Sequence, residues 1–156
     1  FLHNGGRGLS VGNGSLVRRV TAQQNMTGIE ASNQVHLVEC IAYSNALHGF
    51  DCLDGALVTT CVADNNSSEG LRVRSSSYVA RNLFKHNRGQ AGLYAMTNNI
   101  IDENHASYNN RGYYLAGVSN VMTRNTEVVN TLANYYYQPT NWVASEGLNA
   151  PWGNIE

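Results

Sequence analysis

The sequence has little charge, little proline and no long apolar run, and each shortage excludes a class of protein. Only 13% of its 156 residues are charged and the formal net charge is −1, so it has no basic stripe of the kind that binds nucleic acid. No apolar run approaches the ~18 residues of a membrane-spanning segment. We therefore expect a single domain with neither nucleic acid nor a membrane as its partner.

Cysteine is scarce as well. Three cysteines, an odd number, do not build a disulfide framework, and they lack the spacing of zinc ligands. The sequence contains no phosphate-binding loop and no glycine-rich calcium nonapeptide. We predict no metal site and no cofactor.

What the sequence does contain is a repeat. A glycine followed by apolar-x-apolar recurs every 20 to 22 residues, and a degenerate seventh copy lies near Asn134-Tyr135. Polar turns that precede an apolar strand start, and an asparagine that closes each repeat, keep the same phase. The glycines are Gly8, Gly28, Gly49, Gly70, Gly92 and Gly112, and the asparagines are Asn25, Asn45, Asn66, Asn87, Asn109 and Asn130. Three features in phase at one period indicate a solenoid.

The length of the repeat selects the type of solenoid. Each repeat holds three short apolar bursts, none long enough for a helix of ten residues. The Leu-x-x-Leu-x-Leu frame of leucine-rich repeats is absent, and a propeller blade needs about 40 residues. We therefore predict an all-β fold, a single-stranded right-handed parallel β-helix of about six coils with about 21 residues per coil, in which equivalent strands stack about 4.8 Å apart.

The two ends differ from the repeat. The opening Phe1-Leu2-His3-Asn4 resembles the end of a coil, which predicts that further coils or another module precede residue 1. The repeat fades after about Asn130. We predict a β-helix over residues 1–134 and a capping segment over residues 135–156, because terminal repeats of solenoids normally carry caps. An aromatic binding surface is the alternative for the tyrosines and tryptophans of that segment.

The repeat assigns the cysteines to inward columns. Cys52 shares a column with Val11, Ala31, Val73, Ala95 and Leu115. Cys40 and Cys61 share another with Arg19, Asn82, Asn104 and Asn125, of which the three asparagines form an internal amide ladder. Small buried thiols are the expectation, although a disulfide between Cys40 and Cys61 is geometrically conceivable.

The ionisable residues gather on one predicted face. The residue between the two inward apolar positions of the first strand points to solvent, and the residue before the glycine lies beside it. The first column is Ser10, Glu30, Asp51, Arg72, Tyr94 and Tyr114, and the second is Arg7, Thr27, His48, Glu69, Ala91 and Arg111. Arg74 lies two places after Arg72 and joins them.

Two kinds of chemistry use such a face. Uronate lyases and epimerases need a cation for the sugar carboxylate and a group that moves a proton, roles that Arg72, Tyr94 and His48 can fill. A glycoside hydrolase needs two carboxylates about 5 to 9 Å apart, which Glu30 and Asp51 on adjacent coils can provide. The alternative is a cross-strand ladder of opposite charges that only stabilises the stack.

Part of the sequence resembles a known family. Residues 40–50, which end in His48-Gly49-Phe50, and residues 62–71 are similar to the β-helical modules of mannuronan C5-epimerases. More broadly, residues 5–130 resemble the right-handed β-helix repeat family shared with pectate-lyase-like polysaccharide lyases. His48 matches a functional His-Gly-Phe of those epimerases and Asp51 follows by analogy, but their signature Tyr-Gly-Phe-Asp-Pro-His is not kept, because Leu53 stands where its histidine is required.

These observations lead to one functional hypothesis and one rival. The hypothesis is a polysaccharide-interacting domain, with a polyuronate among the candidate ligands, and the resemblance implies an extracellular or periplasmic location. The candidate catalytic residues are His48, Asp51, Arg72 and Tyr94, and the candidate substrate-binding residues are Glu30, Glu69, Arg74, Arg111 and Tyr114. The rival is a non-catalytic structural or adhesive module that associates with copies of itself, which a large exposed apolar patch would favour.

Overall fold

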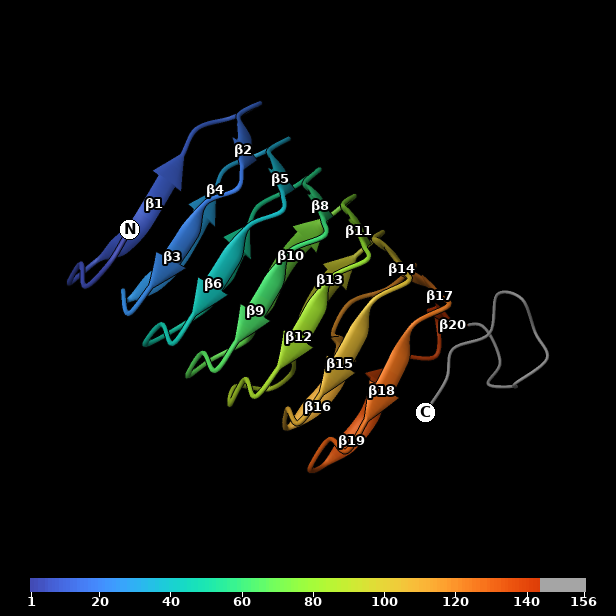
Figure 1. The fold of residues 1–156 in the computed structure, drawn as a ribbon. Helices are drawn as coiled ribbons and strands as arrows, with labels where there is room; N and C mark the ends of the chain where they lie inside the picture. The colour runs from blue at the N-terminus through green and yellow to red at the C-terminus, as the bar shows by residue number, and fades with distance from the viewer. Residues whose placement is uncertain (144–156) are drawn as a thin grey trace.

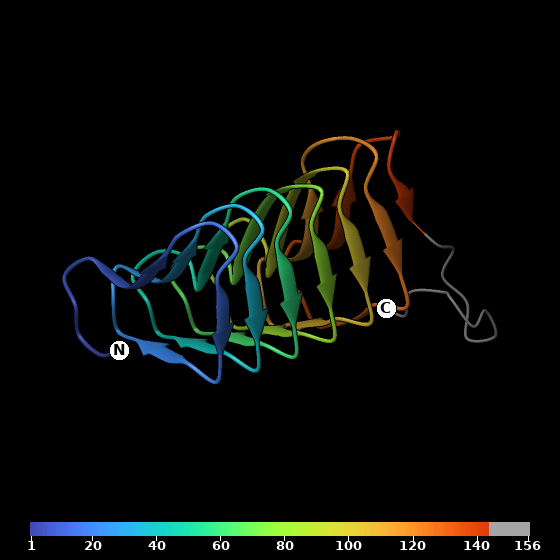
Figure 2. The ribbon, with the colours of Figure 1, turned by 90° about the horizontal axis from the view of Figure 1, so that it is seen from above.

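The computed structural model describes residues 1–143 as a parallel β-solenoid. Successive turns stack along one axis from the blue N-terminal turn to the orange one, and from above they form a row of similar loops (Figures 1 and 2). The described residues contain strands and turns only, and no helix among them is long and apolar enough to cross a membrane. The predicted all-β solenoid with about 21 residues per turn is confirmed.

Each turn contributes one strand to each of three parallel sheets. The first sheet contains β1 (Arg7–Val11), β4 (Thr27–Ala31), β7 (Phe50–Cys52), β10 (Leu71–Ser75), β13 (Leu93–Thr97), β16 (Arg111–Leu115) and β19 (Ala133–Tyr137). The second contains β2 (Leu16–Arg18), β5 (His36–Val38), β8 (Leu57–Thr59), β11 (Tyr78–Ala80), β14 (Ile100–Asp102), β17 (Val121–Thr123) and β20 (Trp142–Val143). The third contains β3 (Thr21–Gln23), β6 (Ile41–Tyr43), β9 (Val62–Asp64), β12 (Leu83–Lys85), β15 (His105–Ser107) and β18 (Thr126–Val128).

The core is built from columns of equivalent side chains. Cys52 pairs in register with Ala31 on one side and Val73 on the other, as the repeat predicts. Cys40 and Cys61 are free, buried thiols. The residue that shares their column in the first turn is Val20 and not Arg19, because Arg18 pairs with Val38 and Thr21 pairs with Ile41. The assignment of Arg19 to this column was therefore wrong by one residue, at a bend where a single left-handed residue offsets the two strands.

Left-handed residues form a column at each of the three bends. Between the first and second sheets they are Gly14, Gln34, Gly55, Ser76, Asn98 and Ser119; between the second and third, Arg19, Glu39, Thr60, Arg81, Glu103 and Arg124; and before the first sheet, His3, Gln24, Ser44, Asn65, His86, Tyr108 and Val129. Their φ angles lie between 53° and 70°, a region that costs an L-residue about 1–2 kcal/mol. The same costly conformation recurs in each described turn because it directs the chain from one sheet into the next.

Buried asparagines satisfy the backbone where the bends enter the core. In the ladder from Asn25 to Asn130, the side-chain oxygen of each asparagine accepts hydrogen bonds from the side chain and the backbone N–H of the asparagine one turn before. The predicted ladder of Asn82, Asn104 and Asn125 follows the same pattern. A third ladder, Asn99, Asn120 and Asn141, lies at the first bend, where the sequence suggested only polar turns.

The solenoid continues through the residues where the sequence predicts the start of a cap. Strand β19 pairs with β16, and β20 pairs with β17. Tyr135 aligns with Tyr113, so the degenerate seventh copy is real. Residues 144–156 lie outside the described residues, and a cap formed by them stays a prediction.

Candidate functional site

The outer face of the first sheet carries the predicted column of polar side chains. Glu30, Asp51, Arg72, Tyr94 and Tyr114 occupy equivalent positions on five successive strands, from β4 to β16. Each side chain points away from the core because the residues on either side of it are the inward apolar ones. The structure therefore brings together the residues that the sequence assigned to this column.

The charged side chains of the column form ion pairs with each other or with a side chain on the preceding strand. Nε of Arg72 donates a hydrogen bond to Oδ1 of Asp51 (2.9 Å), and its Nη2 donates to Oδ2. This bidentate pairing raises the pKa of Arg72 above its ordinary value. Nε of Arg7 on β1 forms an ion pair with Oε2 of Glu30 on β4. The Asp51–Arg72 pair belongs to the cross-strand charge ladder that the sequence gave as an alternative, whereas Glu30 pairs with a residue of the second column.

His48 and Glu69 form a largely buried pair in the column before the glycines. Nδ1 of His48 lies 2.8 Å from Oε2 of Glu69, and the two side chains are only 14% and 9% exposed. The hydroxyl of Ser68 donates to Oε2 of Glu69 (2.6 Å) and the backbone N–H of Gln90 donates to its Oε1 (3.1 Å). The sequence placed both residues on the open face, but they lie recessed at its edge, since the bend at the glycine turns this column toward the core.

The surroundings of Glu69 fix its charge. Burial by itself raises the pKa of this carboxyl, but the contacts with His48, Ser68 and the Gln90 amide outweigh burial and lower the pKa to about 2. Glu69 is therefore a carboxylate at neutral pH and has no proton to donate. A general acid in a glycosidase needs the opposite shift.

Stacked tyrosines continue the column toward the last described turn. The rings of Tyr94 and Tyr114 lie 5.2 Å apart and nearly parallel, and those of Tyr114 and Tyr136 lie 4.6 Å apart. The guanidinium of Arg111 lies 5.6 Å from the centre of the Tyr114 ring and 5.5 Å from that of Tyr136, within cation–π range. Tyr136 was missed as a member of this face because the sequence assigned its segment to a cap.

Two hollows lie along the face. The larger, of about 650 Å³, is lined by Asp54, Glu69, Arg72, Arg74, Ser75, Gln90, Tyr94 and Met96. The second, of about 550 Å³, is lined by Gly6, Arg7, Ser10, Met26, Thr27, Glu30, Leu47, His48, Asp51 and Arg72. Arg72 borders both hollows, so its pair with Asp51 forms the ridge between them. Arg111 and Tyr114 lie beyond the larger hollow rather than in it.

Arg74 differs from Arg7 and Arg72, the ion-paired arginines of this face. Its side chain is exposed, and within residues 1–143 no carboxylate lies within ion-pair distance of it. It lines the larger hollow together with Tyr94 and Gln90. No group of three or more histidine, cysteine, aspartate or glutamate side chains in the described part of the chain is arranged to hold a metal ion.

Comparison with known proteins agrees with the architecture. The family model described as "right handed beta helix region" matches residues 7–143, which include all but the first few described residues. A search of curated proteins found no match. The narrower resemblance to mannuronan C5-epimerases stays a prediction. The repeat, the three parallel sheets and the family match together show that this chain belongs to the right-handed β-helix family.

Proposed function

We propose that the outer face of the first sheet binds an acidic polysaccharide, centred on the larger hollow. The observation that carries the proposal is the exposed guanidinium of Arg74, without an ion pair in the described chain, in a hollow that also presents Tyr94 and Gln90. Arginine binds carboxylates through two parallel hydrogen bonds. A uronate carboxylate is a ligand of matching charge and shape.

The carboxylates near the hollow are each engaged by other groups of the chain. Asp51 is neutralised by Arg72, and Glu69 is held by His48 and by hydrogen bonds from Ser68 and Gln90. Asp54 accepts a hydrogen bond from the backbone N–H of Ser75. The hollow therefore carries charges of both signs, and Arg74 is the cation in it that no described carboxylate pairs.

The shape of the face suits a chain of sugars better than a small compact ligand. The two hollows follow one another across the strands and share Arg72 as their common border. The Tyr94 phenol and the Gln90 amide give hydrogen-bonding groups beside the cation, which a pocket needs for orienting hydroxyl-rich ligands. Neighbouring sugar units can occupy neighbouring hollows.

The protonation states of Glu69 and Tyr94 provide neither a carboxylic acid nor a phenolate base. Glu69 has a pKa of about 2 and gives no acid catalyst. Burial and the neighbouring Tyr114 raise the pKa of the Tyr94 phenol, so it is not activated as a base. Lyase, epimerase or hydrolase chemistry at His48, Asp51, Arg72 and Tyr94 stays a prediction, as does an extracellular or periplasmic location.

The proposal is tested by calorimetric titration of the chain with polygalacturonate, alginate and a neutral glucan. We expect the two acidic polymers to bind and the neutral one not to bind. Arg74→Gln should weaken binding at least tenfold, because a charge-assisted hydrogen bond contributes about 1.5–3 kcal/mol. Arg81→Gln is the matched control, since it removes an equally exposed arginine from the bend between the other two sheets. Equal binding of all three polymers, or equal losses from both variants, would refute the proposal.

A further inference from the structure

A second surface of the solenoid carries a mainly apolar column, which His36 interrupts. The first residue of each strand in the second sheet points outward, and in seven consecutive turns these residues are Leu16, His36, Leu57, Tyr78, Ile100, Val121 and Trp142. Six of the seven are apolar or aromatic. Leu16 is 68% exposed and Ile100 is 47% exposed. We call this row the second-sheet column.

The charges beside this column alternate in a self-complementary order. At the bend that follows the second sheet, the left-handed residues of the first five turns are Arg19, Glu39, Thr60, Arg81 and Glu103. Their charges read positive, negative, neutral, positive and negative. Reversing the order about Thr60 places Arg19 opposite Glu103 and Glu39 opposite Arg81. A surface with this property attracts a copy of itself that runs in the opposite direction.

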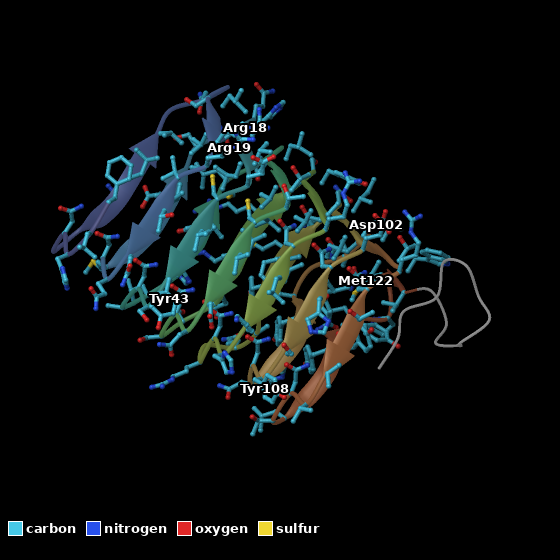
Figure 3. All side chains as sticks on the ribbon, viewed as in Figure 1. Arg18, Arg19, Tyr43, Asp102, Tyr108 and Met122 are labelled. Carbon is cyan, nitrogen blue, oxygen red and sulfur yellow. The ribbon has the colours of Figure 1, made fainter. Side chains whose placement is uncertain are left out.

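The side chains involved are exposed enough to meet a partner. Arg19 and Glu39 pair within the chain, with side chains 72% and 38% exposed, and Glu103 is 41% exposed. Arg81 is exposed and has no ion-pair partner within residues 1–143. Figure 3 shows Arg18 and Arg19 near the N-terminal end of the stack and Asp102, the neighbour of Glu103, farther along it.

We propose that two copies of this chain associate through their second sheets, antiparallel, about a two-fold axis that passes between the two Leu57 side chains. An axis parallel to the strands reverses the stacking direction and brings the same bend of both copies together. Leu16 then lies opposite Ile100 of the other copy and His36 opposite Tyr78. Arg81, which lacks a partner within the described chain, gains Glu39 of the other copy.

The size of the face sets the strength of the association. Five stacked strands span about 19 Å, and the outward side chains from Leu16 to Ile100 expose roughly 400 Å² per copy if each has a full area of about 150–250 Å². An apolar patch of this area is within the range that monomers carry when the patch is functional. Two copies together would bury about 800 Å², which is below the ~1,200–2,000 Å² of stable specific interfaces, so we expect a weak dimer that forms and dissociates with concentration.

Sedimentation velocity over a wide range of protein concentration tests the proposal. We expect a monomer–dimer equilibrium, and Ile100→Lys should raise its dissociation constant at least tenfold. Ile41→Lys is the matched control, because Ile41 also begins a three-residue strand and is 42% exposed, but on the third sheet. A monomer at every concentration, growth beyond a dimer, or equal effects of the two variants would overturn the proposal.

Cross-linking tests the antiparallel arrangement and does not depend on the lysine variants. An equimolar mixture of Leu16→Cys and Ile100→Cys chains, oxidised with glutathione disulfide, should yield a mixed covalent dimer in excess of either self-linked dimer. The native cysteines are buried and do not compete. Efficient self-linking of Leu16→Cys would instead show copies that run in the same direction.

Discussion

Asn66 offers the sharpest test of how the solenoid is held together. Its side-chain oxygen accepts from the backbone N–H (3.0 Å) and the side-chain N–H (2.9 Å) of Asn45. Its own side-chain N–H groups donate to the Ala42 carbonyl (3.1 Å) and to Oδ1 of Asn87 (2.9 Å). Asn66→Ala removes all four hydrogen bonds at once and leaves their partners buried.

The expected cost follows from those orphaned groups. Each buried polar group left without a partner costs about 1–3 kcal/mol, and the Asn45 N–H and the Ala42 carbonyl have no route to water through the closed core. We therefore expect Asn66→Ala to lower the free energy of unfolding by about 3–5 kcal/mol. Urea denaturation followed by circular dichroism measures this, and amide hydrogen exchange should become faster at the Asn45 N–H.

The control is an asparagine ladder that water can reach. Oδ1 of Asn33 accepts the backbone N–H of Asp54 (3.1 Å) at an exposed bend. Asn33→Ala removes the same side chain, but water replaces the lost hydrogen bond, so the expected loss is below about 1 kcal/mol. Equal losses from the two variants would refute the argument that burial, rather than the hydrogen bonds alone, makes the inner ladders essential.

Three further predictions follow from single positions. Since the pKa of Glu69 is lowered from 4.5 to about 2, its contribution of about 2–3 kcal/mol to the free energy of unfolding is complete above about pH 5 and is lost as pH falls toward 2. Acid denaturation should show that Glu69→Gln removes this part of the pH dependence. An unchanged acid denaturation profile of the variant would contradict the prediction. Thr60 is a β-branched residue at φ 53°, so Thr60→Gly should stabilise the fold by up to about 1 kcal/mol because it relieves backbone strain. Thr59→Gly in strand β8 relieves no such strain and should destabilise the fold by about 0.5–1 kcal/mol through the entropy of the unfolded chain. Thermal unfolding of both variants distinguishes the two effects. A Cβ at Gly49 would lie 2.6 Å from the Gly70 carbonyl oxygen, whereas one at Gly12 would meet nothing within 4 Å. Gly49→Ala should therefore lower the free energy of unfolding by about 2–3 kcal/mol and Gly12→Ala should leave it almost unchanged. Similar melting temperatures for the two variants would show that the close stacking at Gly49 is not needed.

The repeat in the sequence predicted the stack because each column obeys one physical rule. A position that faces the core is apolar, small or amide-bearing in almost every described turn, with the buried Glu127 in the column of Ala106 as an exception. The repeat alone was therefore enough to place Cys52 and the ladder from Asn25 to Asn130. The outward column from Glu30 to Tyr114 followed from the same alternation. These features depend on period and side-chain type, which a sequence shows directly.

The bends could not be placed as well, because their left-handed residues share no chemical signature. Val129, Thr60 and Arg19 adopt the same conformation as Asn65, although only asparagine favours it intrinsically. The packing of the two flanking strands imposes the conformation instead. The misplaced Arg19 and the unrecognised ladder at Asn99 both lie at bends for this reason.

The sequence predicted which residues share the outward columns, but not how their side chains meet. Columns showed that His48 and Glu69 lie on neighbouring turns, but not that they form a recessed pair. They showed Arg74 near Arg72, but not that Arg72 is held by Asp51 while Arg74 is left without an ion pair in the described chain. Which cation is available to a ligand depends on side-chain directions, and these are set by the structure.

Binding of an acidic polysaccharide to the outer face of the first sheet is best tested by mapping the contact itself. Amide and side-chain NMR signals of the chain should be followed during titration with a short galacturonate oligomer. We predict shifts concentrated on β10 and β13, with the largest at Arg74 and Tyr94, and none on the third sheet. Shifts confined to the second or third sheet, with Arg74 unmoved, would contradict the proposed function.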